Sequence, residues 1–171
     1  HDGEPVPKVI DFGIAKATSA ELTKRTLFTR HAQMLGTPEY MAPEQAEMSG
    51  LDVDTRSDVY ALGVITYELI GDESPYPGLK SDTLLAAVAR LKRERPIGLS
   101  KVAPNTHADL ETIVMKAIAF EPSARYASAA EFAADIERYL QKRPIEARPP
   151  TLGYTLSLFA RRHKAATAAA G

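Results

Sequence analysis

Residues 57–71 constrain the fold most, because apolar side chains occupy almost the whole circumference of the helix predicted there. They are Val59, Leu62, Ile65 and Leu69 on one face and Ala61, Val64 and Tyr67 on the other. Thr55 and Asp58 have the spacing of a capping box at its start, and Gly71 ends it. A helix that is apolar nearly all round is buried, so we expect this one at the centre of the domain.

Three amphipathic helices are predicted to follow, each with a polar residue at its start. Ser81 opens the first, Thr106 and Asp109 cap the second, and Ser128 and Glu131 cap the third. The residues expected to point inward are Leu84, Leu85, Val88 and Leu91 in the first, Leu110, Ile113, Val114 and Ala117 in the second, and Phe132, Ile136, Tyr139 and Leu140 in the third.

The residues before the central helix indicate a different organisation. Residues 5–10 are predicted to form a short strand, and residues 14–36 show no clean period and are interpreted as a long loop. The chain of 171 residues is long enough for one domain with a core, and it contains no cysteine for disulfides or thiolate metal sites. The expected fold class is mainly α: a short strand, a long loop and a helical bundle.

Four separated motifs carry the chemistry. Asp11-Phe12-Gly13 follows the predicted strand, where an Asp carboxylate can bind a hard cation such as Mg²⁺. Taken alone this tripeptide is weak evidence, since a strand that ends in an acidic turn is common. The other three motifs are the run from Gly36 to Glu44 (GTPEYMAPE), the run from Asp58 to Gly63 (DVYALG), and Arg125 within EPSARY.

These motifs, in this order, resemble the protein kinase family, whose Asp-Phe-Gly and Ala-Pro-Glu signatures bracket the activation loop. The resemblance covers residues 5 to about 141. The run from Lys8 to Lys16 and the run from Gly36 to Ala46 are similar to bacterial Hanks-type serine/threonine kinases, and the long tail is similar to receptor-like members of planctomycete type. The expected fold is therefore the C-terminal lobe of a kinase, from the Asp-Phe-Gly motif onward, without its N-lobe.

The resemblance implies roles for individual residues. Asp11 would bind the Mg²⁺ that bridges the ATP phosphates, Phe12 would set the position of Asp11, and Gly13 would complete this cofactor-binding turn. Thr37 would reach the catalytic aspartate and help to place the substrate hydroxyl, and its Gly-Thr-Pro context favours a Ser/Thr acceptor.

Three further residues have structural roles implied by the resemblance. Glu44 and Arg125 would form a buried ion pair that holds the end of the activation segment. Asp58 would accept backbone hydrogen bonds from the catalytic loop. The alternative for Asp58 is a simple helix cap, because a carboxylate is favourable in the first turn of any helix.

Thr26 and Thr29 are the candidate phosphorylation sites of the loop. A phosphate on either would add about −2 charge near Lys24, Arg25, Arg30 and His31 and could order the loop. The alternative is a solvated polar loop that is not modified.

The resemblance also shows what this sequence lacks. A Gly-rich loop, the ATP-binding lysine with its helix glutamate, and the His-Arg-Asp catalytic loop are absent. We expect serine/threonine kinase activity with ATP and Mg²⁺ in the full-length protein, and no activity from this fragment alone. The alternative is a pseudokinase that serves as a scaffold or binding module. Expected partners are ATP, protein substrates and the missing N-lobe.

The chain changes character near residue 140. From Arg138 onward there are seven Lys or Arg residues and one acid, Glu146, although the whole chain has a net charge of −1. This balance gives no reason to expect a nucleic-acid partner. We divide the chain into a partial kinase domain (1–141), a basic juxtamembrane-like linker (142–164) and the expected start of a transmembrane helix (165–171). The prediction is a cytoplasmic kinase domain, anchored in the inner membrane by a segment after Gly171; the alternative is a basic surface linker.

Overall fold

The computed structural model describes residues 38–46, 54–149, 151, 154 and 158. All of them belong to one unit of the chain, residues 36–171. Every regular element in this described part is a helix, which confirms a mainly α architecture. The strand expected at residues 5–10 and the loop expected at 14–36 lie outside the described residues.

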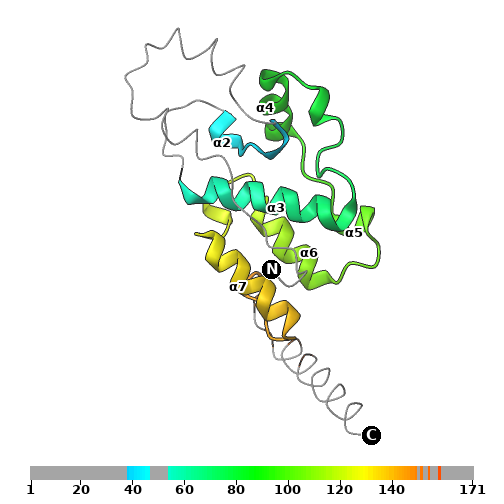
Figure 1. Ribbon diagram of the computed structural model, residues 1–171, viewed down its shortest axis with the longest axis vertical. Coiled ribbons are helices and arrows are strands. Elements are labelled where there is room, and N and C mark those ends of the chain that lie inside the picture. The colour runs from blue at the N-terminus through cyan, green and yellow to red at the C-terminus, as the bar shows by residue number, and fades with distance from the viewer. Residues whose placement is uncertain (1–37, 47–53, 150, 152–153, 155–157, 159–171) are drawn as a thin grey trace, which may run out of the picture. The chain divides into compact units, whose positions relative to one another are not determined.

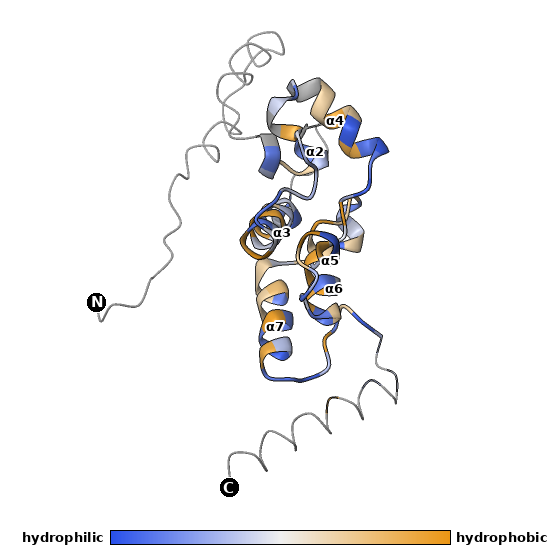
Figure 2. Cartoon of the chain, turned by 90° about the vertical axis from the view of Figure 1, so that its right-hand side faces the viewer, coloured by the Kyte–Doolittle hydropathy of each residue, from blue (hydrophilic) through white to orange (hydrophobic). Residues whose placement is uncertain are grey.

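The helices are arranged around one long central helix, α3. In chain order the elements are η2 (Pro38–Tyr40), α2 (Pro43–Ala46), α3 (Thr55–Gly71), η3 (Leu79–Ser81), α4 (Leu84–Arg93), α5 (Leu99–Val102), α6 (Ala108–Ala117), η4 (Pro122–Ala124) and α7 (Ala129–Leu140). Figure 1 shows α3 between α2 and α4 on one side and α6 and α7 on the other. Figure 2, turned by 90°, shows the same order with α3 seen nearly end-on. The central position predicted for this helix is confirmed.

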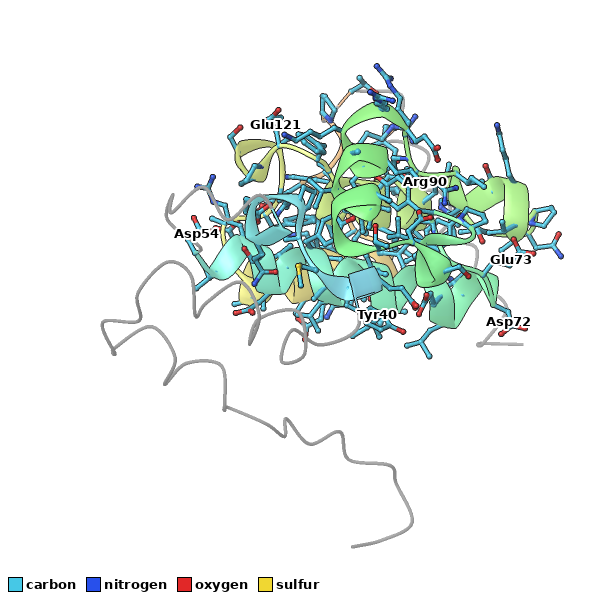
Figure 3. The ribbon with its side chains drawn as sticks, turned by 90° about the horizontal axis from the view of Figure 1, so that it is seen from above. Tyr40, Asp54, Asp72, Glu73, Arg90 and Glu121 are labelled. Carbon is cyan, nitrogen blue, oxygen red and sulfur yellow. The ribbon has the colours of Figure 1, made fainter. Side chains whose placement is uncertain are left out.

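The ends of α3 are defined by two aspartates, which Figure 3 shows at opposite ends of the helix. The carboxylate of Asp54 accepts a hydrogen bond from the Arg56 amide at 2.8 Å and caps the first turn. Asp72 adopts a left-handed conformation (φ 54°), and its amide donates to the Glu68 carbonyl. The predicted capping box was wrong, because the hydroxyl of Thr55 donates to the Ala127 carbonyl and Asp58 is exposed.

The buried face of α3 differs from the face expected to be inward. Val59, Tyr60, Gly63, Val64 and Tyr67 are buried. Of the predicted stripe, Leu62, Ile65 and Leu69 have exposed fractions of 40%, 43% and 82%. Gly63 explains why this face is buried. A β-carbon at this position would lie only 2.8 Å from the side chains of Ala117, the last residue of α6, and of Ile118, which follows it. The glycine face is therefore where α6 makes its closest approach.

Two of the three predicted helix starts shift along the chain. Thr83, not Ser81, caps α4 by accepting from the Ala86 amide. His107, not Thr106, caps α6 through Nδ1, which accepts from the Asp109 amide. Ser128 caps α7 as predicted, since its hydroxyl accepts from the Glu131 amide at 3.2 Å.

The inward faces of α6 and α7 are largely those predicted. Ile113, Val114 and Ala117 are buried, and Phe132 packs in the same cluster as Ile113 and Ala117. Leu140 is the exception, with 70% of its surface exposed. No described helix is both long and apolar enough to span a bilayer.

Candidate functional site

A bidentate ion pair joins Glu44 of α2 to Arg125, which directly follows η4. The two terminal nitrogens of the Arg125 guanidinium donate to the two carboxylate oxygens of Glu44 at 2.7 and 2.9 Å. The side chain of Arg125 is 0% exposed and that of Glu44 is 17% exposed. The structure thus brings together two sequence-predicted residues that are 81 positions apart.

The remaining donors of Arg125 are also used. Nε donates to the Ala119 carbonyl at 2.7 Å, and the terminal nitrogens donate additionally to the carbonyls of Arg56 (3.2 Å) and Phe120 (2.8 Å). The guanidinium lies 4.9 Å from the centre of the Tyr60 ring, within the range of a cation–π interaction. A guanidinium has five N–H donors. All five have acceptors here, so Arg125 ties α2, α3 and the chain after α6 into one joint.

Glu44 is held in its ionised form by its neighbours. Burial raises the pKa of its carboxyl, but hydrogen bonds from Arg125, its own backbone and Ser57 outweigh that effect and lower the pKa below the ordinary 4.5. The Ser57 hydroxyl donates to the Glu44 carboxylate at 2.7 Å. The short helix α2 is therefore bound to the first turn of α3 as well as to Arg125.

The other end of this segment is attached farther along α3. The hydroxyl of Tyr40 in η2 donates to the Glu68 carboxylate at 2.7 Å. Within the same segment, the side chain of Gln45 accepts from the Ala42 amide at 3.0 Å. Residues 38–46 are consequently fixed along most of the length of α3, with Ala42 fully buried between the attachments.

The other sequence-predicted residues fall into two groups. Asp58 is exposed in the first turn of α3, and its role stays a prediction. Asp11, Phe12, Gly13, Thr26, Thr29 and Thr37 lie outside the described residues. Among the residues that are described, His, Asp and Glu side chains form no group of three that could hold a metal ion.

Sequence reasoning missed three residues of α3 that hold this segment. Ser57 and Tyr60 contact the Glu44–Arg125 pair, and the Glu68 carboxylate accepts the hydrogen bond from the Tyr40 hydroxyl. Ser57 and Glu68 have side chains that are ordinary on exposed helix surfaces. Only the position of Tyr60 one residue after Val59, on a helix expected to be buried, offered a signal.

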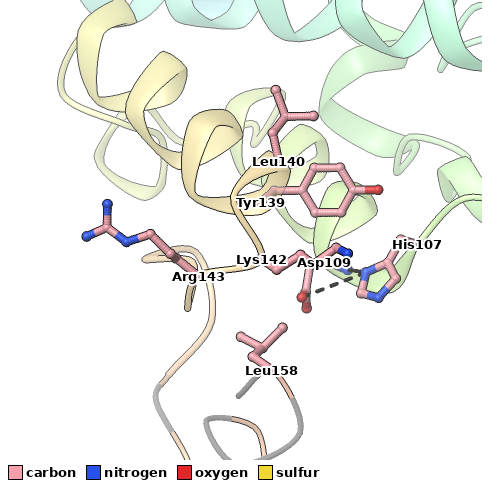
Figure 4. Close-up of a pocket in the computed structure, with 7 residues that line it drawn as sticks. All are labelled: His107, Asp109, Tyr139, Leu140, Lys142, Arg143 and Leu158. Atoms are coloured by element: carbon pink, nitrogen blue, oxygen red, sulfur yellow. Dashed lines mark hydrogen bonds and ion pairs between the residues drawn. The ribbon is translucent and has the colours of Figure 1, made fainter. Parts of the chain in front are cut away.

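A small cavity of about 230 Å³ lies in another part of the described chain. His107, Asp109, Tyr139, Leu140, Lys142, Arg143 and Leu158 line it, as Figure 4 shows. Neither Glu44 nor Arg125 is among these lining residues, so the cavity is separate from the joint.

Comparison of the sequence with known proteins identifies a family and several relatives of this chain. Residues 1–136 match the family described as the protein kinase domain. The chain is 41% identical over 140 residues to the serine/threonine-protein kinase PknB of Mycobacterium leprae, and equally so to PknB of Mycobacterium tuberculosis. It is 41% identical over 128 residues to the serine/threonine-protein kinase Pkn1 of Myxococcus xanthus.

The matches cover most of this chain and a small part of each relative. The PknB alignments cover 82% of the chain and 21% of each relative, and the Pkn1 alignment covers 75% and 17%. The chain therefore spans about a fifth of the length of the curated relatives that it matches.

Proposed function

Because the chain belongs to the protein kinase family, we propose that it is part of a serine/threonine kinase that transfers a phosphoryl group from ATP to protein hydroxyls. The bidentate Glu44–Arg125 pair is the observation that carries this proposal. It holds the final residues of the GTPEYMAPE motif against the central helix, as a kinase requires for the end of its activation segment.

The value of this joint for phosphoryl transfer is positional. Transfer depends on holding the acceptor hydroxyl in line with the γ-phosphate and stabilising the charge that develops. Residues 38–46 follow Thr37 in the chain and are attached to the rest of the domain through Tyr40 and Glu44. These attachments are proposed to restrict the position of Thr37. Thr37 is then proposed to face the substrate hydroxyl.

Asp11 is proposed as the Mg²⁺ ligand of the same site, with Phe12 and Gly13 forming the turn around it. A carboxylate suits a hard cation that otherwise keeps phosphate and water oxygens. Bound Mg²⁺ would neutralise charge on the phosphates of ATP. We propose that the residues of this chain hold the Asp11 carboxylate and the acceptor hydroxyl of the substrate at a fixed distance and orientation.

The exposed face of α3 is proposed to meet another part of the kinase domain. Leu62, Ile65 and Leu69 follow one another at helical spacing, and all three are exposed. Asp58 lies one turn before them on the same face and is exposed too. Since single domains seldom leave such a row in water, we assign this face to residues beyond those described, with Asp58 positioned for the catalytic loop.

The test is phosphoryl transfer by the longer protein that contains this chain. With ATP and Mg²⁺, we expect phosphate on a threonine-containing protein acceptor and on Thr26 or Thr29, read by mass spectrometry. Asp11→Asn should abolish transfer, whereas Asp72→Asn, at an exposed aspartate at the end of α3, should not. A folded long protein that transfers no phosphate would favour the pseudokinase alternative.

The isolated 171-residue chain provides the second arm. It lacks the Gly-rich loop, the ATP-binding lysine and the catalytic aspartate. We expect no ATP-dependent phosphorylation from it under the conditions in which the long protein is active. Activity of this chain by itself would contradict the roles proposed for those absent parts.

A further inference from the structure

The chain after α7 turns back onto the helical bundle. We propose that residues 143–149 and Tyr154, called the strap below, dock on two buried carboxylates, Asp109 and Asp135, and that this docking keeps Arg125 in place beside Glu44. The docking is inferred from contacts within the described residues, and only its consequence for Glu44 rests on the proposed kinase function.

A Schellman motif starts the reversal. The Arg143 amide donates to the Arg138 carbonyl at 2.8 Å, and the Lys142 amide donates to the Tyr139 carbonyl at 3.0 Å. Lys142 takes the left-handed position of this motif, with φ 54°, where glycine is usual. A lysine holds this conformation only when the structure around it compensates, which indicates that contacts made by the strap support the turn.

The first support is Asp135, a residue of α7 with no exposed surface. Its two carboxylate oxygens accept from the amides of Glu146 (2.6 Å) and Ala147 (2.9 Å). Arg138 donates to the same carboxylate at 3.4 Å and also pairs with the Glu146 carboxylate at 2.6 Å. Two successive strap amides thus end on one buried side chain.

The second support is Asp109, near the start of α6. Its carboxylate accepts from Arg148 at 3.1 Å and from the Tyr154 hydroxyl at 3.0 Å. The Tyr154 hydroxyl also accepts from the Ile145 amide at 3.3 Å, and the Arg148 guanidinium lies 4.9 Å from the Tyr154 ring centre. Strap residues therefore supply two hydrogen bonds to this buried carboxylate.

Burial of an apolar side chain completes the docking. Ile145 is only 3% exposed and belongs to the cluster that contains Val59 of α3 and Ile113 of α6. Leu158 is buried as well and lines the cavity of Figure 4 together with Lys142 and Arg143. Part of the segment expected from sequence to be a linker from residue 142 thus packs in the core, while the domain division itself stays a prediction.

Tyr126 connects the strap to the Glu44–Arg125 pair. Its hydroxyl donates to the Asp135 carboxylate at 2.8 Å, in the same hydrogen-bonded group as Glu146 and Ala147. Tyr126 is buried and directly follows Arg125 in the chain. Release of the strap would leave Asp135 without two of its donors, and because hydrogen bonds in one buried network support one another, the bond between Asp135 and Tyr126 would weaken.

Amide exchange in the complete 171-residue chain tests the docking. In the unmodified chain we expect the Glu146 and Ala147 amides to be protected as strongly as amides in the middle of α7. Tyr154→Phe, which keeps the ring but removes the hydroxyl, should lower the protection of both amides by about tenfold or more. Asp135→Asn should have a larger effect, and Glu137→Gln, at an exposed glutamate of α7 outside the strap, should have none.

The Nε proton of Arg125, followed by NMR, tests the coupling. It should exchange faster in Tyr154→Phe than in the unmodified chain, although Tyr154 does not touch Arg125. Unprotected Glu146 and Ala147 amides in the unmodified chain would overturn the docking. A strap that opens in Tyr154→Phe while the Arg125 proton is unchanged would overturn the coupling. Neither result depends on kinase activity, so both differ from a failure of the proposed function.

Discussion

At the scale of single residues, Arg125 shows why a buried charge can persist in this fold. Its five N–H donors meet Glu44 and three backbone carbonyls, so no part of the guanidinium is left without an acceptor. A buried pair of this kind often gains little over apolar residues of the same size. Loss of one partner is costly, however, because the other charge then stays buried without compensation.

Glu44→Gln should therefore lower the free energy of unfolding at neutral pH by about 3 kcal/mol, the low end for buried pairs because Glu44 keeps 17% of its side chain exposed. Because the folded pKa of Glu44 lies below 4.5, its contribution is complete above that pH and is lost as pH falls through the folded pKa. Urea midpoints from pH 7 to pH 3 should show the gap between wild type and Glu44→Gln closing. Glu121→Gln, at an exposed glutamate, is the control; a gap that is constant with pH would contradict this assignment.

Tyr67 presents the opposite case, a buried polar atom without compensation. Its hydroxyl has no hydrogen-bond partner among the described residues, and burial raises its pKa. Tyr67→Phe removes an unsatisfied group and keeps the ring, so thermal unfolding should show a gain of about 1 kcal/mol. Tyr126→Phe is the matched control and should lose stability, because its hydroxyl donates to Asp135. Destabilisation by Tyr67→Phe would mean that this hydroxyl has a partner.

At the scale of elements, the contact between α3 and α6 depends on a glycine. Gly63 faces Ala117 and Ile118 so closely that a β-carbon would lie 2.8 Å from each side chain and 3.2 Å from the Ala117 backbone. The backbone contact cannot be relieved by a rotamer change, so the helices would have to separate. The buried tyrosines and valines of α3 pack in the two clusters that also contain the buried residues of α6.

Gly63→Ala should consequently destabilise the chain by about 1–3 kcal/mol, the usual cost of overpacking. In an exposed helix position the same change would stabilise by up to about 1 kcal/mol through helix propensity, so the sign is diagnostic. Thr66→Ala, one turn away and with its hydroxyl bonded within α3, is the control and should be neutral or stabilising. A higher urea midpoint for Gly63→Ala would contradict the close approach.

At the scale of the whole molecule, three of the four large apolar side chains that are exposed among the described residues form one row, Leu62, Ile65 and Leu69. Replacement of all three by Gln in the 171-residue chain should leave helicity unchanged and reduce self-association, measured by sedimentation velocity. Leu140→Gln, at an exposed leucine of α7 outside this row, should have little effect. Loss of helicity in the triple variant would show that this face is part of the core.

Much of the candidate site was predictable, but from resemblance and not from spacing. No local pattern relates Glu44 to Arg125, which are 81 residues apart. Their pairing was predicted because the ordered motifs resemble those of a family in which the two residues form an ion pair. The attachment of Tyr40 to Glu68 has no such signature, since a tyrosine and a glutamate are common on any helix surface. The four longer helices α3, α4, α6 and α7 were predictable from their apolar period. The starts of α3, α4 and α6 shifted by one or two residues because several polar side chains compete as caps, whereas Ser128 caps α7 as predicted.

The amino-acid sequence by itself determined the family of the chain and the central position of residues 57–71, because the order of the motifs and the apolar residues on every side of this helix are both written in the chain. Tertiary structure alone decided which face of α3 is buried, since a helix with apolar residues on every side carries no preference until Gly63 meets α6. The tertiary structure also decided that Asp109 and Asp135 are buried. In sequence both resemble surface or cap residues, and their donors Arg148 and Glu146 reach them only after the chain reverses at Lys142.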